Sequence, residues 1–76
     1  MNAMERRKAS SQAYLLPNIY ELCQEKGVSI AELERESGLG NGVVRKWDKA
    51  SPTLRSVAAV ARYFGVTLET LVSKHA

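Results

Sequence analysis

Two short helical patterns joined by a glycine-containing turn lie within residues 29–50, SIAELERESGLGNGVVRKWDKA. The first opens with a capping box, because Ser29 can accept a hydrogen bond from the backbone N–H of Glu32 while the Glu32 side chain reaches back to the N–H of Ser29. We expect this helix to run to about Ser37 and to be broken by Gly38. It is the first half of a two-helix unit.

The second pattern is a helix that we expect to start with Asn41 as its N-cap and to end at about Asp48 or Lys49. Val44 and Trp47 are three residues apart and therefore face inward together. The outward face carries residues at spacings i, i+3, i+4 and i+7, namely Gly42, Arg45, Lys46 and Lys49. Two capped helices that cross steeply around a glycine turn form a helix-turn-helix unit.

A further helix is expected before this unit, from Pro17 to Lys26. Proline suits a first helical turn, and Gly27 suits the left-handed position that ends a helix. The apolar face of this helix carries Leu15, Ile19, Leu22 and Cys23. Cys23 is the only cysteine, so no internal disulfide forms, and we expect it to pack in the core and not to act as a nucleophile.

Two more helices follow the unit, with Thr53 and Thr67 as their N-caps and Gly65 between them. The inward residues are expected to be Leu54, Val57, Ala58, Ala61 and Phe64 in the fourth helix, and Leu68, Leu71 and Val72 in the fifth. None of these helices is long enough to be stable alone, so all five must share one core, to which the second helix contributes mainly Leu33. The sequence therefore predicts an all-α, five-helix domain over residues 14–76, preceded by a flexible basic arm, 1–13.

Length and composition limit the class of protein. The chain has 76 residues, of which 45% are apolar, so it forms one small globular domain. No apolar run approaches the roughly 20 residues of a membrane span, and the N-terminus lacks the apolar stretch of a signal peptide. We expect a soluble, cytoplasmic protein.

The positive charge is concentrated in one segment. The net charge of the chain is +3, and residues 39–56 alone carry +3, from Arg45, Lys46, Lys49 and Arg55 against Asp48. Residues 14–38 carry −3. Positive charge on one element is the electrostatic signature of a nucleic-acid-binding protein, although an ordinary solvated face has the same pattern.

The residue types on the outward face suit the edges of DNA bases. The Asn41 amide matches adenine, and the Arg45 guanidinium matches the two acceptors of guanine. Lys46 can reach a base or a phosphate, and Gly42 permits close approach of the backbone. The starts of the second and third helices can also bind phosphates through their partial positive charge.

Each of these residues has a simpler interpretation. Asn41 can be an N-cap only, and Arg45 and Lys46 can be solvated surface residues. Trp47 is the only tryptophan, but its spacing indicates a core residue more than a functional one. The spacing of the whole set favours a function in nucleic-acid binding.

From about Leu16 to Ser73 the sequence resembles the lambda-repressor-like family of Cro and phage-repressor helix-turn-helix domains. The resemblance lies in EKGVSIAELERESGL, GNGVVRKWDKASP and LRSVAAVARYFGVTLETLV. It implies a bacterial or phage-encoded transcriptional regulator of the phage or mobile-element type, acting as a repressor, whose third helix reads bases in the major groove of double-stranded DNA. By position, base reading falls on Gly40, Asn41, Gly42, Arg45 and Lys46, and phosphate contacts on Ser29, Lys49, Ser51 and Thr53.

The resemblance also implies a homodimer on DNA. Candidate contact residues near the C-terminus are Tyr63, Leu68, Leu71 and Val72, of which the last three can equally be core. The sequence departs from the family at three positions. Ile30 stands where glutamine is frequent, Glu34 where a small residue packs between the two helices, and Ser37 where an apolar residue is usual.

Two other functions compete with DNA binding. An antitoxin-like or co-regulator module would act through protein–protein contacts, using the fifth helix and an exposed Tyr63, but it would not need Arg45 and Lys46 beside Gly42. An enzyme is disfavoured, because His75 has no acid, base or nucleophile cluster around it. We expect no catalytic residues, no metal and no cofactor.

Overall fold

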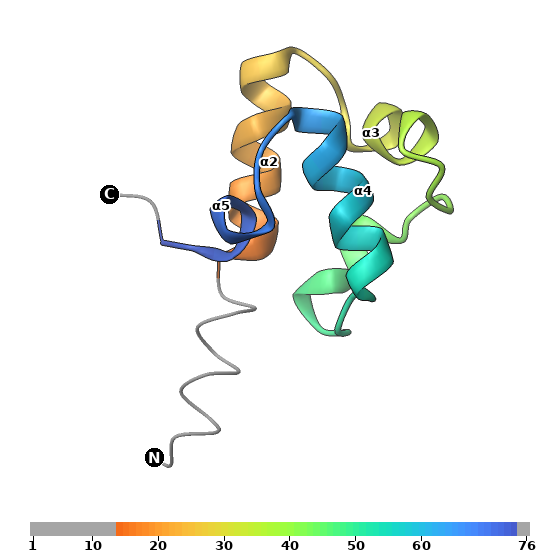
Figure 1. Cartoon of the computed structure of the whole chain (residues 1–76). Helices are drawn as coiled ribbons and strands as arrows, with labels where there is room; N and C mark the ends of the chain where they lie inside the picture. Colours follow the sequence, from red (N-terminus) through yellow and green to blue (C-terminus); the bar gives the residue numbers. More distant parts are fainter. Residues whose placement is uncertain (1–13, 75–76) are drawn as a thin grey trace.

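The computed structural model describes residues 14–74 and forms four α-helices and one 3-10 helix, with no strand in this range (Figure 1). The elements are α2 (Leu15–Lys26), α3 (Ile30–Glu36), the 3-10 helix η1 (Val44–Asp48), α4 (Leu54–Phe64) and α5 (Leu68–Val72). The all-α class is confirmed. The predicted basic arm, 1–13, and His75 lie outside the described residues.

Local capping signals in the sequence fix most helix ends. The capping box is present, with Glu32 N donating to Ser29 Oγ at 3.0 Å and Ser29 N donating to Glu32 Oε1 at 2.9 Å. Thr53 and Thr67 cap α4 and α5 in the same way, each accepting a bond of 3.1 Å from the backbone three residues later. α2 and α4 end at glycines in the left-handed conformation, as predicted.

Helix α2 is the centre of the fold. It packs against α3, η1 and α5, while α4 packs against α3 and α5 (Figure 1). The core that these helices share consists of Leu15, Leu16, Ile19, Cys23, Leu33, Val44, Trp47, Val57, Val60, Ala61 and Leu71. Burial raises the pKa of the Cys23 thiol, which keeps it protonated and agrees with a packing role.

One polar side chain joins the two ends of the described chain. Asn18 in the first turn of α2 is buried, and its Nδ2 donates to the carbonyls of Leu71 and Ser73, each at 2.8 Å. These carbonyls belong to the last turn of α5, where a helix leaves its acceptors without partners. Asn18 therefore supplies donors that α5 cannot supply itself.

The predicted inward stripe of α4 was wrong at its first residue. Leu54 is 73% exposed, whereas Val60, which was not predicted, is fully buried. The stripe that reaches the core runs through Val57, Val60 and Ala61 at spacings i, i+3 and i+4. Leu54 is the first residue of α4, and the residues of this helix that reach the core come one turn or more later.

Candidate nucleic-acid interface

The segment expected to be the third α-helix is shorter and tighter than predicted. Residues 41–43 form a turn, and only Val44–Asp48 are helical, in the 3-10 form η1. Asn41 is not the N-cap, because that position falls on Val43, whose side chain makes no cap. Gly42 has a φ of +83°, a left-handed conformation that an α-helix cannot contain. Residues 14–74 therefore contain four α-helices and η1, and the prediction of five α-helices is wrong at this segment.

The inward side of η1 agrees with the prediction. Val44 is fully buried and Trp47 is 3% exposed, and the element packs against α2. Trp47 is thus a core residue that anchors η1 to the domain. A buried aromatic anchor fixes which side of this short element faces solvent.

The opposite side of η1 carries exposed cations. Arg45, Lys46 and Lys49 are all exposed, as are Gly40 and Asn41 in the turn that precedes η1. Gly42 is half-buried. The predicted base-reading residues are consecutive neighbours within 40–46, and the structure leaves the side chains of Arg45 and Lys46 free of the core.

The predicted phosphate-binding residues are also exposed, but two of their hydroxyls already have structural roles. Ser29 Oγ accepts the cap bond of α3, and Thr53 Oγ1 accepts the cap bond of α4 while donating to Ser56 Oγ at 2.9 Å. Lys49 follows the last residue of η1, and Ser51 lies in the loop that leads from there to α4. Ser29 keeps its own hydroxyl proton for an external acceptor, whereas Thr53 does not.

A buried carboxylate that was not predicted as a site residue holds the start of η1. Glu34 in α3 is 3% exposed, and its Oε1 and Oε2 accept from the backbone N–H of Gly42 and of Val44, each at 2.9 Å. The N–H groups of Gly42 and Val44 are therefore not available to a phosphate. The expectation that the start of the third helix binds phosphate is wrong for these two N–H groups. The signal in the sequence was the departure at position 34, where a small residue is usual.

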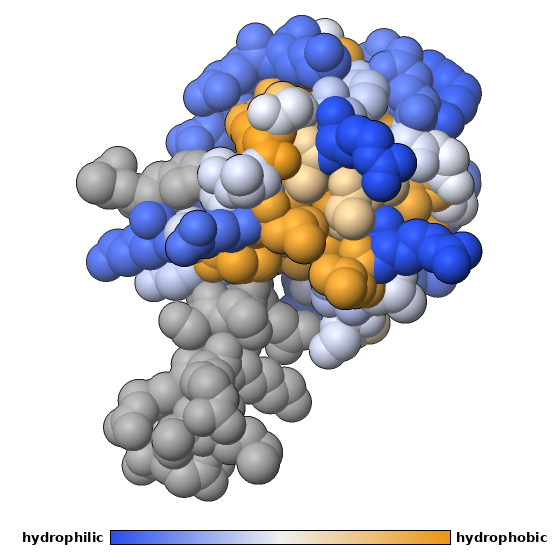
Figure 2. Space-filling view, viewed as in Figure 1, coloured by the Kyte–Doolittle hydropathy of each residue, from blue (hydrophilic) through white to orange (hydrophobic). Residues whose placement is uncertain are grey.

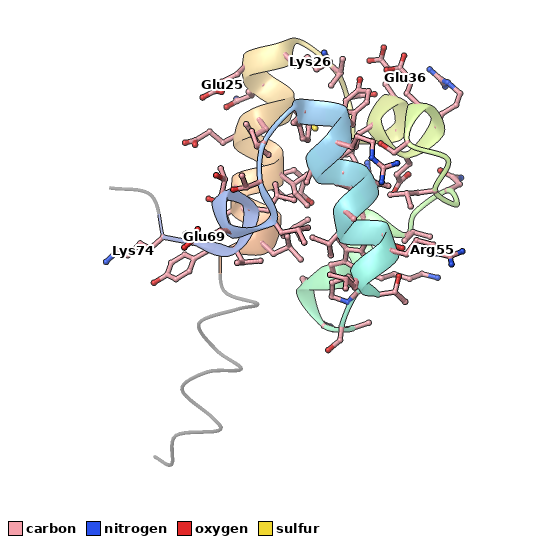
Figure 3. All side chains as sticks on the ribbon, in the orientation of Figure 1. Glu25, Lys26, Glu36, Arg55, Glu69 and Lys74 are labelled. Carbon is pink, nitrogen blue, oxygen red and sulfur yellow. The ribbon has the colours of Figure 1, made fainter. Side chains whose placement is uncertain are left out.

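A further cation lies near the loop after η1. Figure 3 shows Arg55 projecting from the first turn of α4, away from the end of the molecule where Glu25, Lys26 and Glu36 project. Arg55 is exposed and follows the loop after η1, so it joins the candidate phosphate contacts. Its position in the basic segment was the sequence signal.

Comparison with known protein families matches residues 18–74 to the Cro/C1-type HTH DNA-binding domain. The chain belongs to this family. Comparisons with curated proteins and with solved structures gave no significant match. DNA binding is the property that defines Cro/C1-type domains, and the exposed cationic side of η1 lies within the matched residues.

Two further departures of this Cro/C1-type domain from the usual sequence have visible consequences. Ile30, in place of glutamine, is half-buried and packs against the core, so the first turn of α3 offers no amide side chain there. Ser37 follows α3, and its Oγ is buried without a hydrogen-bond partner among the residues that the structure describes. Nothing in the structure explains the hydroxyl at position 37.

Tyr63 of this Cro/C1-type domain is half-buried and engaged within the fold. Its hydroxyl donates a short hydrogen bond of 2.5 Å to Glu36 Oε1, and the ammonium of Lys26 lies 5.1 Å from its ring centroid. The hydrogen bond to the Glu36 carboxylate, more than any other effect, raises the pKa of Tyr63 to about 12. The ring also contacts Phe64 edge to face.

The four dimer candidates of this Cro/C1-type domain differ in exposure, and Tyr63, expected to be exposed, is half-buried. Leu71 is fully buried and cannot touch a partner, so its assignment to a dimer contact was wrong. Leu68 is 37% exposed and Val72 is half-buried. Apolar surface gathers over α4 and α5 in the middle of Figure 2.

Within the part of the chain that the structure describes, no cluster of metal-ligating side chains is present. None of the described helices combines the length and the apolar character needed to cross a bilayer.

Proposed function

We propose that this Cro/C1-type domain is a sequence-specific regulator of transcription, acting as a repressor, that places η1 in the major groove of double-stranded DNA. The observation that carries the proposal is the two-sided character of η1. Val44 and Trp47 anchor one side in the core, while Arg45 and Lys46 leave the other side as exposed cations. A major groove about 12 Å wide admits an element of this size.

Base reading is assigned to the segment from Gly40 to Lys46. Arg45 presents a planar fork that suits guanine, and Asn41, released from any capping role, presents an amide that suits adenine. Gly40 and Gly42 have no side chains, so the backbone can approach the base edges closely. Lys46 can contact a base or a phosphate.

Phosphate contacts are assigned to exposed groups on either side of η1. Ser29 at the start of α3 can donate its hydroxyl proton, and Lys49 and Arg55 supply cations along the loop and the first turn of α4. Ser51 and the backbone of Thr53 are the remaining candidate phosphate contacts in the loop before α4. Such contacts fix the orientation of the protein on the duplex and do not select a sequence.

A homodimer on DNA completes the proposal. One short reading element contacts few base pairs, and two-fold dimers of such domains read two half-sites of a palindrome. The apolar surface over α4 and α5 is the candidate contact (Figure 2). Leu68 and Val72 are retained as candidates from the sequence prediction, and Leu54 is added because it is 73% exposed.

The test is selection of bound duplexes from a random pool, followed by affinity measurements on the selected duplex and on a scrambled one at several salt concentrations. We expect one enriched motif, a large preference for it, and a logarithmic salt slope of about −0.9 for each phosphate neutralised. Light scattering of the complex should give two copies of the chain per duplex. No enrichment and no salt-dependent shift would refute DNA reading and favour a protein-interaction module.

A further inference from the structure

The turn that leads into η1 has little side-chain packing to hold it. A Cβ placed on Gly38 or on Gly42 would meet no heavy atom within 4 Å, and a surface hollow of about 490 Å³ lies between this turn and α3. Leu39 and Val43 pack against the core on either side of the segment. A Cβ on Gly40 would lie 3.1 Å from Val43 Cγ2, and the Gly40 carbonyl accepts from Val43 N at 3.2 Å, but these contacts are within the turn and do not join it to α3. Another interaction must therefore fix the proposed adenine reader Asn41 and its neighbour Gly42 relative to α3.

Glu34 supplies that interaction from the neighbouring helix. Its two carboxylate oxygens accept from Gly42 N and Val44 N at 2.9 Å, and its backbone carbonyl accepts from Leu39 N at 2.8 Å. One residue of α3 thus holds both ends of the turn. Glu34 is 3% exposed, the bond to Val44 N is buried and the bond to Gly42 N is partly buried, so competition from water is weak.

We infer that Glu34 is the positioning residue of the DNA-reading segment: its buried carboxylate sets the place and orientation of Asn41 and Arg45 relative to α3, without touching DNA itself. The inference rests on the proposed function. Hydrogen bonds from backbone N–H groups to a carboxylate are among the stronger ones in proteins, and they fix direction as well as distance. Gly42 takes part because its left-handed φ of +83° turns its N–H toward the carboxylate.

Electrostatics alone predicts the opposite effect of removing this carboxylate. A negative charge beside the DNA-binding face repels phosphates, so Glu34→Gln should strengthen binding to every duplex if charge were all that mattered. A positioning role predicts weaker binding to the selected duplex only. The sign of the change therefore separates the two interpretations.

The experiment compares the wild-type chain with Glu34→Gln, Glu34→Asp and a control, Glu25→Gln, which removes an exposed carboxylate from α2. Affinities for the selected and the scrambled duplex are measured at one salt concentration and corrected for the folded fraction from circular dichroism. Without DNA, amide hydrogen exchange is measured at Gly42 and Val44. Glu34→Asp keeps the charge but shortens the reach, so it serves if Glu34→Gln does not fold.

We expect Glu34→Gln to lower the ratio of selected to scrambled affinity by at least about tenfold, the equivalent of one good base contact. Exchange at Gly42 and Val44 should accelerate by at least about tenfold, because a side-chain amide offers only one acceptor oxygen to the two N–H groups. Glu34→Asp should change both quantities in the same direction, and Glu25→Gln should leave both unchanged. An unchanged ratio in a folded Glu34 variant would overturn the inference. A wild-type chain that fails to select any duplex would refute the proposed function instead. The exchange result would still test whether the Glu34 carboxylate holds the amides of Gly42 and Val44.

Discussion

The buried amide of Asn18 gives the sharpest test of how the domain is held together. Asn18→Ala removes two hydrogen bonds of 2.8 Å, to the carbonyls of Leu71 and Ser73. The Leu71 bond is buried, so its acceptor loses its partner without access to water, at a cost of about 1–3 kcal/mol. The Ser73 bond is partly buried, and we assign it about 0.5–1 kcal/mol.

Alanine offsets part of this cost, because it favours a helix over asparagine by about 0.6 kcal/mol. The net expected loss is about 2 kcal/mol, which lowers the Tm of a domain of this size by about 8–16 °C. Differential scanning calorimetry measures the shift directly. Hydrogen exchange should show the loss first in α5, whose last turn Asn18 holds.

Gln24→Ala is the matched control, since Gln24 is exposed on the same helix and should change stability by no more than about 0.5 kcal/mol. Asn18→Asp should be worse than Asn18→Ala, because it turns an anion toward the same carbonyl oxygens. A Tm for Asn18→Ala that matches the Tm of Gln24→Ala would show that Asn18 does not hold α5 in place.

Arg45→Ala should lose about 1–3 kcal/mol on the selected duplex and much less on a scrambled one, whereas Lys49→Ala should weaken both equally and reduce the salt slope by about one; equal losses for Arg45→Ala would make Arg45 a phosphate contact. Trp47→Ala removes a side chain that is 3% exposed and should cost about 3–5 kcal/mol in urea denaturation, so a variant that melts within a few degrees of wild type would contradict its burial. The raised pKa of Tyr63 means that its stabilising contribution is complete below pH 10 and is lost as the pH rises toward 12, because the unfolded chain ionises first. An absorbance titration should show a tyrosine phase that extends toward pH 12, and Glu36→Gln should move this phase to lower pH; a titration that Glu36→Gln leaves unchanged would refute the Tyr63–Glu36 bond.

Features that depend on neighbouring residues could be predicted from the sequence. The capping box at Ser29, the caps at Thr53 and Thr67, and the glycine at position 65 all act within one turn, so residue type and spacing suffice. The inward position of Trp47 followed from its spacing to Val44 in the same way.

Features that depend on contact between distant segments could not be predicted. The start of η1 is capped by Glu34 from another helix, so a search for a local cap assigned Asn41 instead. The role of Asn18 requires knowing that α5 ends beside the first turn of α2, 53 residues later. Leu54 fits the apolar period of α4, and only the arrangement of the helices leaves it exposed.

In the proposed complex, the 3-10 form of η1 limits how much sequence this element of one copy can specify. Five residues at about 2.0 Å each span about 10 Å, and base pairs repeat every 3.4 Å, so η1 would face about three base pairs. Three base pairs hold about six bits, and a pair of half-sites holds about twelve, which a random sequence matches about once in 4,000 positions. A genome of roughly a million base pairs would then contain hundreds of chance matches. In the proposed complex, the remaining information would have to come from the turn at residues 40–43 and from the distance and the orientation between the half-sites, so the geometry of the proposed dimer would itself be part of the code.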